Sequence, residues 1–133
     1  MRPNPNTPEA WLAYAHSDLA LASAIIPGVM LENLCFHVQQ AAEKSLKAVL
    51  IFRQIAFPKT HSITLLIELL PADIERTSTL LEAVALTEYA TVVRYPGEIE
   101  PITEEEYQHL LALSTKVMRW AEEIIKSNKS GYD

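Results

Sequence analysis

The longest uninterrupted hydrophobic and polar pattern lies between Val29 and Ala56, where neither Gly nor Pro occurs. On a helical wheel, apolar and small residues form one broad arc, which comprises Leu34, Val38, Ala41, Ala42, Ser45, Val49 and Phe52. The other side mixes apolar residues with a polar stripe of His37, Gln40, Glu43, Lys44 and Lys47. A helix that is apolar nearly all round is typical of the centre of a bundle, so the stripe is expected to pair internally or to line a cleft.

Four further segments carry helical patterns. The central helix is predicted to span residues 31–53. The other predicted helices span residues 7–26, 63–70, 79–92 and 103–126. Side chains that can accept hydrogen bonds from free backbone amides stand before three of them: Thr7, Ser62, and Thr103 in a capping box with Glu106. Turn or break signals separate the helices, at Pro27-Gly28, Phe57-Pro58, Pro71 and Arg94-Tyr95-Pro96-Gly97.

These segments predict an all-α protein, an antiparallel four-helix up-and-down bundle with one additional short helix. At 133 residues the chain is long enough for one domain with its own core, so residues 1–133 are assigned to a single domain. Residues 1–6 and 128–133 are polar and are expected to be loose.

Composition narrows the functional classes. The net charge of −6 provides no overall basic field that would attract nucleic acid. One cysteine, Cys35, lies within a helical pattern and is expected to be a buried thiol in a reducing compartment. The first residues have no apolar run and no segment is long and apolar enough to cross a membrane, which predicts a cytoplasmic protein. The four His do not occur at metal-ligand spacings, so neither a metal nor another cofactor is expected.

The polar stripe of the central helix offers candidate binding groups. His37, Gln40 and Lys44 share one edge, which fits either a solvated edge with Gln40 reaching Lys44 or a ligand-binding edge. Glu43 and Lys47 form an i,i+4 pair in the favourable order, worth only about 0.2–0.5 kcal/mol on an exposed face.

Two further candidates stand outside that helix. His61, before the short helix, fits a capping or surface residue, or a general acid or base. Arg94 precedes an abrupt break and can reach a helix end, an internal acid or a phosphate. The candidate ligand-binding residues are therefore Arg94, Tyr95, Lys44, Lys47 and Gln40.

Four elements in this order resemble the HEPN family (higher eukaryotes and prokaryotes nucleotide-binding). They are Trp11-Leu12 with Asp18-Leu19, the block from Cys35 to Ala48, Thr60-His61-Ser62-Ile63, and Arg94-Tyr95-Pro96-Gly97. The resemblance implies an all-helical protein that pairs with a minimal nucleotidyltransferase in a toxin–antitoxin type arrangement, as a non-catalytic or weakly catalytic partner that binds nucleotide or RNA.

The alternative that the resemblance implies is a metal-independent ribonuclease. Family nucleases use an Arg, four to six intervening residues and a His, and this spacing is absent here: no His follows Arg94 until His109, and seven residues separate Arg53 from His61. A ribonuclease would need a displaced site, with Arg94, His37 and His61 as its catalytic candidates. The sequence leaves open whether the chain is an enzyme.

Two structural predictions complete the interpretation. We expect a homodimer, because the central helix has a near-continuous apolar surface and Trp120 and Tyr107 look exposed. We also expect Glu43 to pair with Arg94 in a partly buried seam.

Overall fold

The computed structural model describes residues 6–24, 26–90 and 102–130, with side chains as far as 127. Its elements are α1 (Pro8–Ser23), α2 (Leu31–Phe52), α3 (Ile63–Glu68), α4 (Ser78–Ala83), the 3₁₀ helix η1 (Val84–Tyr89) and α5 (Glu104–Ser130). These described ranges contain no strand, so the predicted all-α class is confirmed. None of the helices in the same ranges has the length and hydrophobicity needed to cross a membrane.

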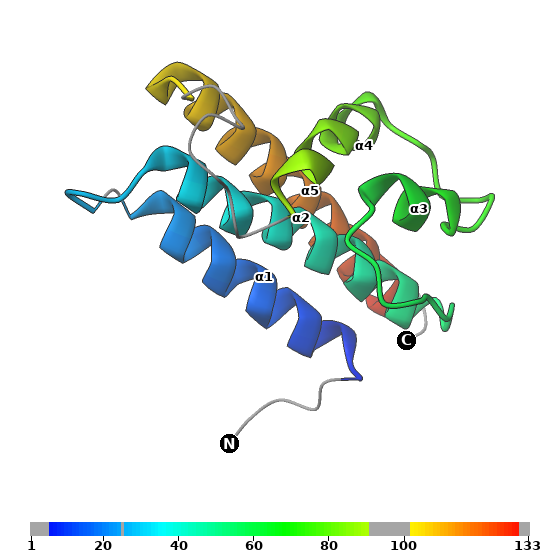
Figure 1. Ribbon diagram of the computed structural model, residues 1–133. Coiled ribbons are helices and arrows are strands. Elements are labelled where there is room, and N and C mark those ends of the chain that lie inside the picture. Colours follow the sequence, from blue (N-terminus) through cyan, green and yellow to red (C-terminus); the bar gives the residue numbers. More distant parts are fainter. Residues whose placement is uncertain (1–5, 25, 91–101, 131–133) are drawn as a thin grey trace.

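The predicted central helix is central in the structure. α2 packs against α1 on one side and α5 on the other, while α3 and η1 pack against α2 as well (Figure 1). Most of its apolar residues are buried, and Val38, Leu46, Val49 and Leu50 are fully buried. The buried Ser114 hydroxyl on α5 donates to the Val38 carbonyl at 2.7 Å, which adds a polar link between α2 and α5.

The structure divides the helix predicted for residues 79–92. The segment forms α4 and then the tighter η1, and residues 91 and 92 lie outside the described ranges. Thr87 in η1 accepts a hydrogen bond from the Ile63 backbone N–H at 3.2 Å, so this turn is tied to the start of α3. The described part therefore has three long helices, α1, α2 and α5, where the sequence predicted four.

The predicted capping residues are confirmed. Thr7 accepts from the Ala10 amide at 3.1 Å, and Ser62 accepts from the Leu65 amide at 3.1 Å. Thr103 accepts from the Glu106 amide at 3.1 Å and donates its hydroxyl to the Glu106 carboxylate at 3.3 Å. The first helix ends at Ser23, a little before the predicted 26, because the backbone at Ala24 is already extended.

The structure weakens the reasons given for a homodimer. Most apolar side chains of α2 are buried within one protomer, although Phe36 and Ile51 remain partly exposed, and Tyr107 is fully buried in the same core rather than exposed. Trp120 is partly buried against that core. The burial of Tyr107 removes one reason for the homodimer, which stays a prediction.

Candidate functional site

Three residues of the polar stripe of α2, Gln40, Glu43 and Lys47, form a buried network with Gln39. Gln39, Glu43 and Lys47 repeat every four residues and so lie above one another on one helix face, with Gln40 beside them. All four residues are at most 7% exposed. Buried polar groups are costly unless they are hydrogen-bonded, so each of these side chains needs a partner.

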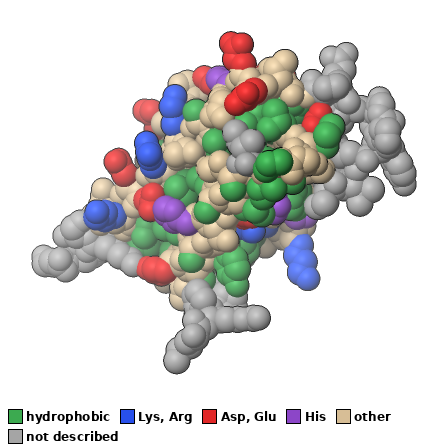
Figure 2. Space-filling model, turned by 90° about the vertical axis from the view of Figure 1, so that its left-hand side faces the viewer, with side chains coloured by type: hydrophobic (Ala, Val, Ile, Leu, Met, Phe, Trp, Pro, Cys, Tyr) green, Lys and Arg blue, Asp and Glu red, His purple; other side chains and the backbone are tan. Residues whose placement is uncertain are grey.

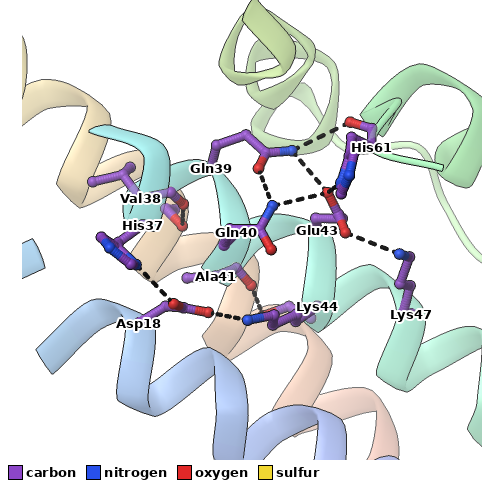
Figure 3. A network of polar contacts seen from close by, with 12 residues as sticks. Asp18, His37, Val38, Gln39, Gln40, Ala41, Glu43, Lys44, Lys47 and His61 are labelled. Carbon is purple, nitrogen blue, oxygen red and sulfur yellow. Dashed lines mark hydrogen bonds and ion pairs between the residues drawn. The ribbon is translucent and has the colours of Figure 1, made fainter. Parts of the chain in front are cut away.

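Glu43 is the centre of this network (Figure 3). One carboxylate oxygen, Oε1, accepts from Gln39 Nε2 at 3.1 Å, Gln40 Nε2 at 3.2 Å and His61 Nδ1 at 2.8 Å. The other, Oε2, accepts from Lys47 Nζ at 2.9 Å. Gln40 also donates to Gln39 Oε1 at 2.7 Å, which orients both amides. Four donors thus hold one carboxylate.

The electrostatics of Glu43 follow from these contacts. Burial, the largest single effect, acts to raise the pKa of its carboxyl, but hydrogen bonds from Lys47, Gln39 and His61 and the charge of Lys47 together outweigh it. The pKa of Glu43 is therefore lower than its ordinary value, and the carboxylate stays charged in the interior. The Lys47 ammonium group lies over two neighbouring aromatic rings, 5.5 Å from the centroid of Trp11 and 5.6 Å from that of Phe57.

His61 reaches Glu43 from the loop before α3. Its backbone carbonyl accepts from Gln39 Nε2 at 3.2 Å, and the neighbouring Thr60 and Ser62 side chains cap the amides that follow. The imidazole is 64% exposed, although its partner carboxylate is buried. Because an ionised carboxylate only accepts, Nδ1 carries the proton, and in a neutral ring Nε2 is left as the acceptor. A carboxylate that orients a His in this way is a common arrangement for a general base.

A second cluster joins α1 to α2. Asp18 on α1 lies between two α2 residues, with Oδ1 3.0 Å from His37 Nδ1 and Oδ2 2.6 Å from Lys44 Nζ (Figure 3). His37 and Lys44 are two turns apart on α2, and Asp18 bridges them. Both are partly exposed.

The structure therefore separates the candidates that the sequence grouped together. Gln40 contacts Gln39 and Glu43 instead of Lys44, whereas Lys44 pairs with Asp18. The Glu43–Lys47 pair is confirmed, but it is buried rather than solvated.

The remaining sequence candidates fall into two groups. His37 and His61 belong to different clusters, each bound to its own carboxylate. Arg94 and Tyr95 lie outside the described residues, so the Glu43–Arg94 pair stays a prediction.

Sequence reasoning gave no role to Gln39, Asp18 or Trp11. For Gln39 a signal was available, since it stands four residues before Glu43 as Lys47 stands four after. Asp18 and Trp11 come from α1, and their contacts with α2 depend on how the two helices pack.

The described surface includes two cavities. One of about 260 Å³ lies between α1 and α2 and is lined by Ala10, Trp11, Tyr14 and Lys44. The other, of about 600 Å³, lies at the start of α5, where its lining residues are Tyr89, Thr103, Glu105, Glu106, His109 and Leu110. Burial, with the nearby Glu88, raises the pKa of Tyr89 to about 12, so its phenol stays protonated at neutral pH. Within the described ranges, no three His, Cys, Asp or Glu side chains are placed to hold a metal ion.

Comparison with known proteins decides the family. The sequence profile of the HEPN domain matches residues 8–124, which is most of the chain. The chain belongs to the HEPN family. Its described helices, from α1 almost to the end of α5, lie within the matched range.

Two crystal structures agree with this assignment. The HEPN chain is similar to TT1696 from Thermus thermophilus, with 30% identity and a TM-score of 0.77 over 89% of this chain and 98% of that one. It is also similar to ST0689, described as an archaeal HEPN homologue, with 28% identity and a TM-score of 0.69 over 90% of this chain and 98% of that one. The comparison with curated proteins finds no match.

Proposed function

We propose that this HEPN protein is a non-catalytic or weakly catalytic partner of a minimal nucleotidyltransferase in a toxin–antitoxin type pair, and that it binds nucleotide or RNA. The observation that carries the proposal is the internal pairing of the α2 polar stripe. Gln40, Glu43 and Lys47 are 2–7% exposed and bonded to one another or to neighbours, which is typical of a network that stabilises a scaffold.

Exposed hydrophobic side chains support a docking role. Leu21, Ile26, Val29 and Met30, which cluster in sequence at the connection between α1 and α2, are 38–60% exposed. Figure 2 looks onto this end of the molecule, where acidic, basic and His side chains are scattered among hydrophobic ones rather than gathered into a basic patch. A surface of this mixed kind favours a protein partner over extended contact with a phosphate backbone.

The experiment begins with the reading frames beside this gene. A neighbouring frame that encodes a minimal nucleotidyltransferase should yield a stable complex when the two proteins are co-expressed and purified through a tag on one of them. Met30→Glu should weaken the complex, whereas the matched exposed change Lys116→Glu on α5 should leave it intact. Absence of such a frame, or separate elution of the two proteins, would contradict the proposal.

The homodimer is tested in parallel. If the exposed α1–α2 connection also joins two copies, sedimentation at micromolar concentration should show twice the 14.9 kDa protomer mass, and Met30→Glu should shift it to the monomer. A single 14.9 kDa species for the unmodified chain would exclude the homodimer.

A second candidate function is metal-independent RNA cleavage, and the exposed His61 imidazole held by Glu43 favours it. In such a reaction His61 Nε2 takes the proton of a ribose 2′-hydroxyl, whose oxygen attacks the adjacent phosphorus. The 5′-oxygen leaves and takes a proton from solvent, and Arg94 is the proposed cation for the phosphate.

Labelled RNA incubated in the presence of a chelator tests this candidate. His61→Ala and Arg94→Ala should each abolish cleavage, whereas His109→Ala, an exposed His on α5, should retain it. Cleavage that survives His61→Ala, or no cleavage by any of the proteins, would rule out the site.

A further inference from the structure

The cavity between α1 and α2 combines features that recur in ligand sites. Its residues come from two turns of α1 (Ala10, Trp11 and Tyr14) and one position of α2 (Lys44). The walls are two aromatic rings, the floor is the small and buried Ala10, and one charged group lies at the edge. The volume of about 260 Å³ is just below the roughly 300–1,000 Å³ of drug-sized pockets, so the cavity suits one ring system, and groups attached to the ring can extend through its open mouth.

The aromatic walls differ in how firmly they are held. Trp11 packs edge-on against Phe57 with 6.0 Å between ring centroids, and the buried Lys47 lies over its ring. Tyr14 is 49% exposed, so part of its surface is open to solvent. Trp11 is thus held in place by its neighbours, while the Tyr14 ring is accessible to a planar ligand that can stack on it.

Lys44 provides the charge at the rim. Its ammonium group lies 5.7 Å from the Tyr14 ring centroid and 2.6 Å from Asp18 Oδ2. Asp18 uses its other oxygen for His37, so its charge is shared between two donors. An ammonium group has three N–H donors, and Asp18 accepts one, which leaves two that can bind an anionic oxygen beside the aromatic ring.

We infer that this cavity binds a planar aromatic ring joined to an anionic group, with the ring on Tyr14 and the anion on Lys44. Two sources share this chemistry, a nucleoside monophosphate and an aromatic carboxylate. In its nucleoside monophosphate form the inference rests on the nucleotide binding proposed above. It does not depend on the nucleotidyltransferase partner or on His61, so it can fail while either of those proposals stands.

The two Trp side chains provide the measurement. In a spectrum of the ¹⁵N-labelled protein, the Trp11 and Trp120 indole N–H groups give separate signals, assigned with Trp120→Phe. Titration with uridine or adenosine 5′-monophosphate, or with indole-3-carboxylate, should move the Trp11 signal and leave that of Trp120 in place. The probe that binds more tightly identifies the source. Uridine lacks the anionic group, and inorganic phosphate lacks the aromatic ring. Each should therefore bind at least about fivefold more weakly than uridine 5′-monophosphate.

Matched variants locate the site. Tyr14→Ala should weaken binding at least about fivefold because it removes the stacking surface, whereas Tyr14→Phe should retain it. Lys44→Met keeps the aliphatic stem but removes the charge and should weaken binding roughly tenfold, whereas Lys116→Met on α5 should have no effect. If none of the aromatic anions moves the Trp11 signal up to millimolar concentration, or if Tyr14→Ala binds as tightly as Tyr14→Phe, the inference is wrong.

Discussion

The Glu43 and Asp18 clusters contain the same three kinds of group, a carboxylate with one Lys and one His, yet they differ in burial. The side chains of Glu43 and Lys47 are 3% and 9% exposed, whereas those of Asp18 and Lys44 are 11% and 22% exposed. Glu43 also receives two amide donors from Gln39 and Gln40. The Glu43 cluster thus lies inside the protomer, and the Asp18 cluster lies at the seam between α1 and α2.

This difference determines what each cluster is expected to contribute. A buried charge that loses its partner stays in a medium that solvates it poorly, so its removal is costly. A partly exposed charge regains water when its partner is lost, which reduces the cost. Removing the carboxylate should therefore destabilise the protein more in the Glu43 cluster than in the Asp18 cluster, although both clusters contain the same kinds of group.

The largest effect is expected for Glu43→Ala. It leaves Lys47 buried without its carboxylate, and the free energy of unfolding should fall by about 3–5 kcal/mol. Denaturant titration measures the change, with circular dichroism confirming that the variant is folded before titration. A loss below about 1 kcal/mol would show that the network is not the buried unit described here.

A smaller loss is expected for Asp18→Ala. Two charged hydrogen bonds disappear, but His37 and Lys44 can both turn to solvent, so the cost should stay within about 1.5–3 kcal/mol. The same titration provides the value. If Asp18→Ala destabilises the protein more than Glu43→Ala, the burial argument that separates the two clusters fails.

Acid should also distinguish the clusters. Because the pKa of Glu43 is lower in the folded protein than its ordinary value of 4.5, its charge stabilises the fold above that pH. This contribution is lost as the pH falls below 4.5 and through the folded pKa. Unfolding free energies measured across this range should fall more steeply for the unmodified chain than for Glu43→Gln. If the unfolding free energies of the two proteins fall in parallel with pH, the lowered pKa of Glu43 is contradicted.

The smallest effect is expected at the exposed His16–Glu122 pair between α1 and α5. Its side chains are 53% and 40% exposed at a distance of 3.0 Å, so Glu122→Gln should change stability by no more than about 1 kcal/mol. Thermal or denaturant unfolding at two salt concentrations checks this value. A larger loss would mean that an exposed ion pair on α1 contributes as much to the free energy of unfolding as a buried one.

Sequence patterns were reliable where a local rule decides the outcome. The spacing of apolar residues placed α2 at the centre, and Thr7, Ser62 and Thr103 cap the helices that they precede. The Glu43–Lys47 pair was also local, since both residues lie on one helix. Such features depend on neighbours within four residues, and a helix fixes those neighbours through its own geometry.

Contacts between distant segments needed the tertiary structure. The surroundings of Glu43 include His61 from the loop before α3, and the role of Lys44 depends on its contact with Asp18 on α1. The same holds for Tyr107, whose burial removes the surface on which the homodimer was based. The sequence by itself determined the three long helices, the caps at Thr7, Ser62 and Thr103, and the family, because these follow from local spacing and motif order. Packing alone decided which polar groups meet, because the burial of a charge depends on segments far from it in the chain.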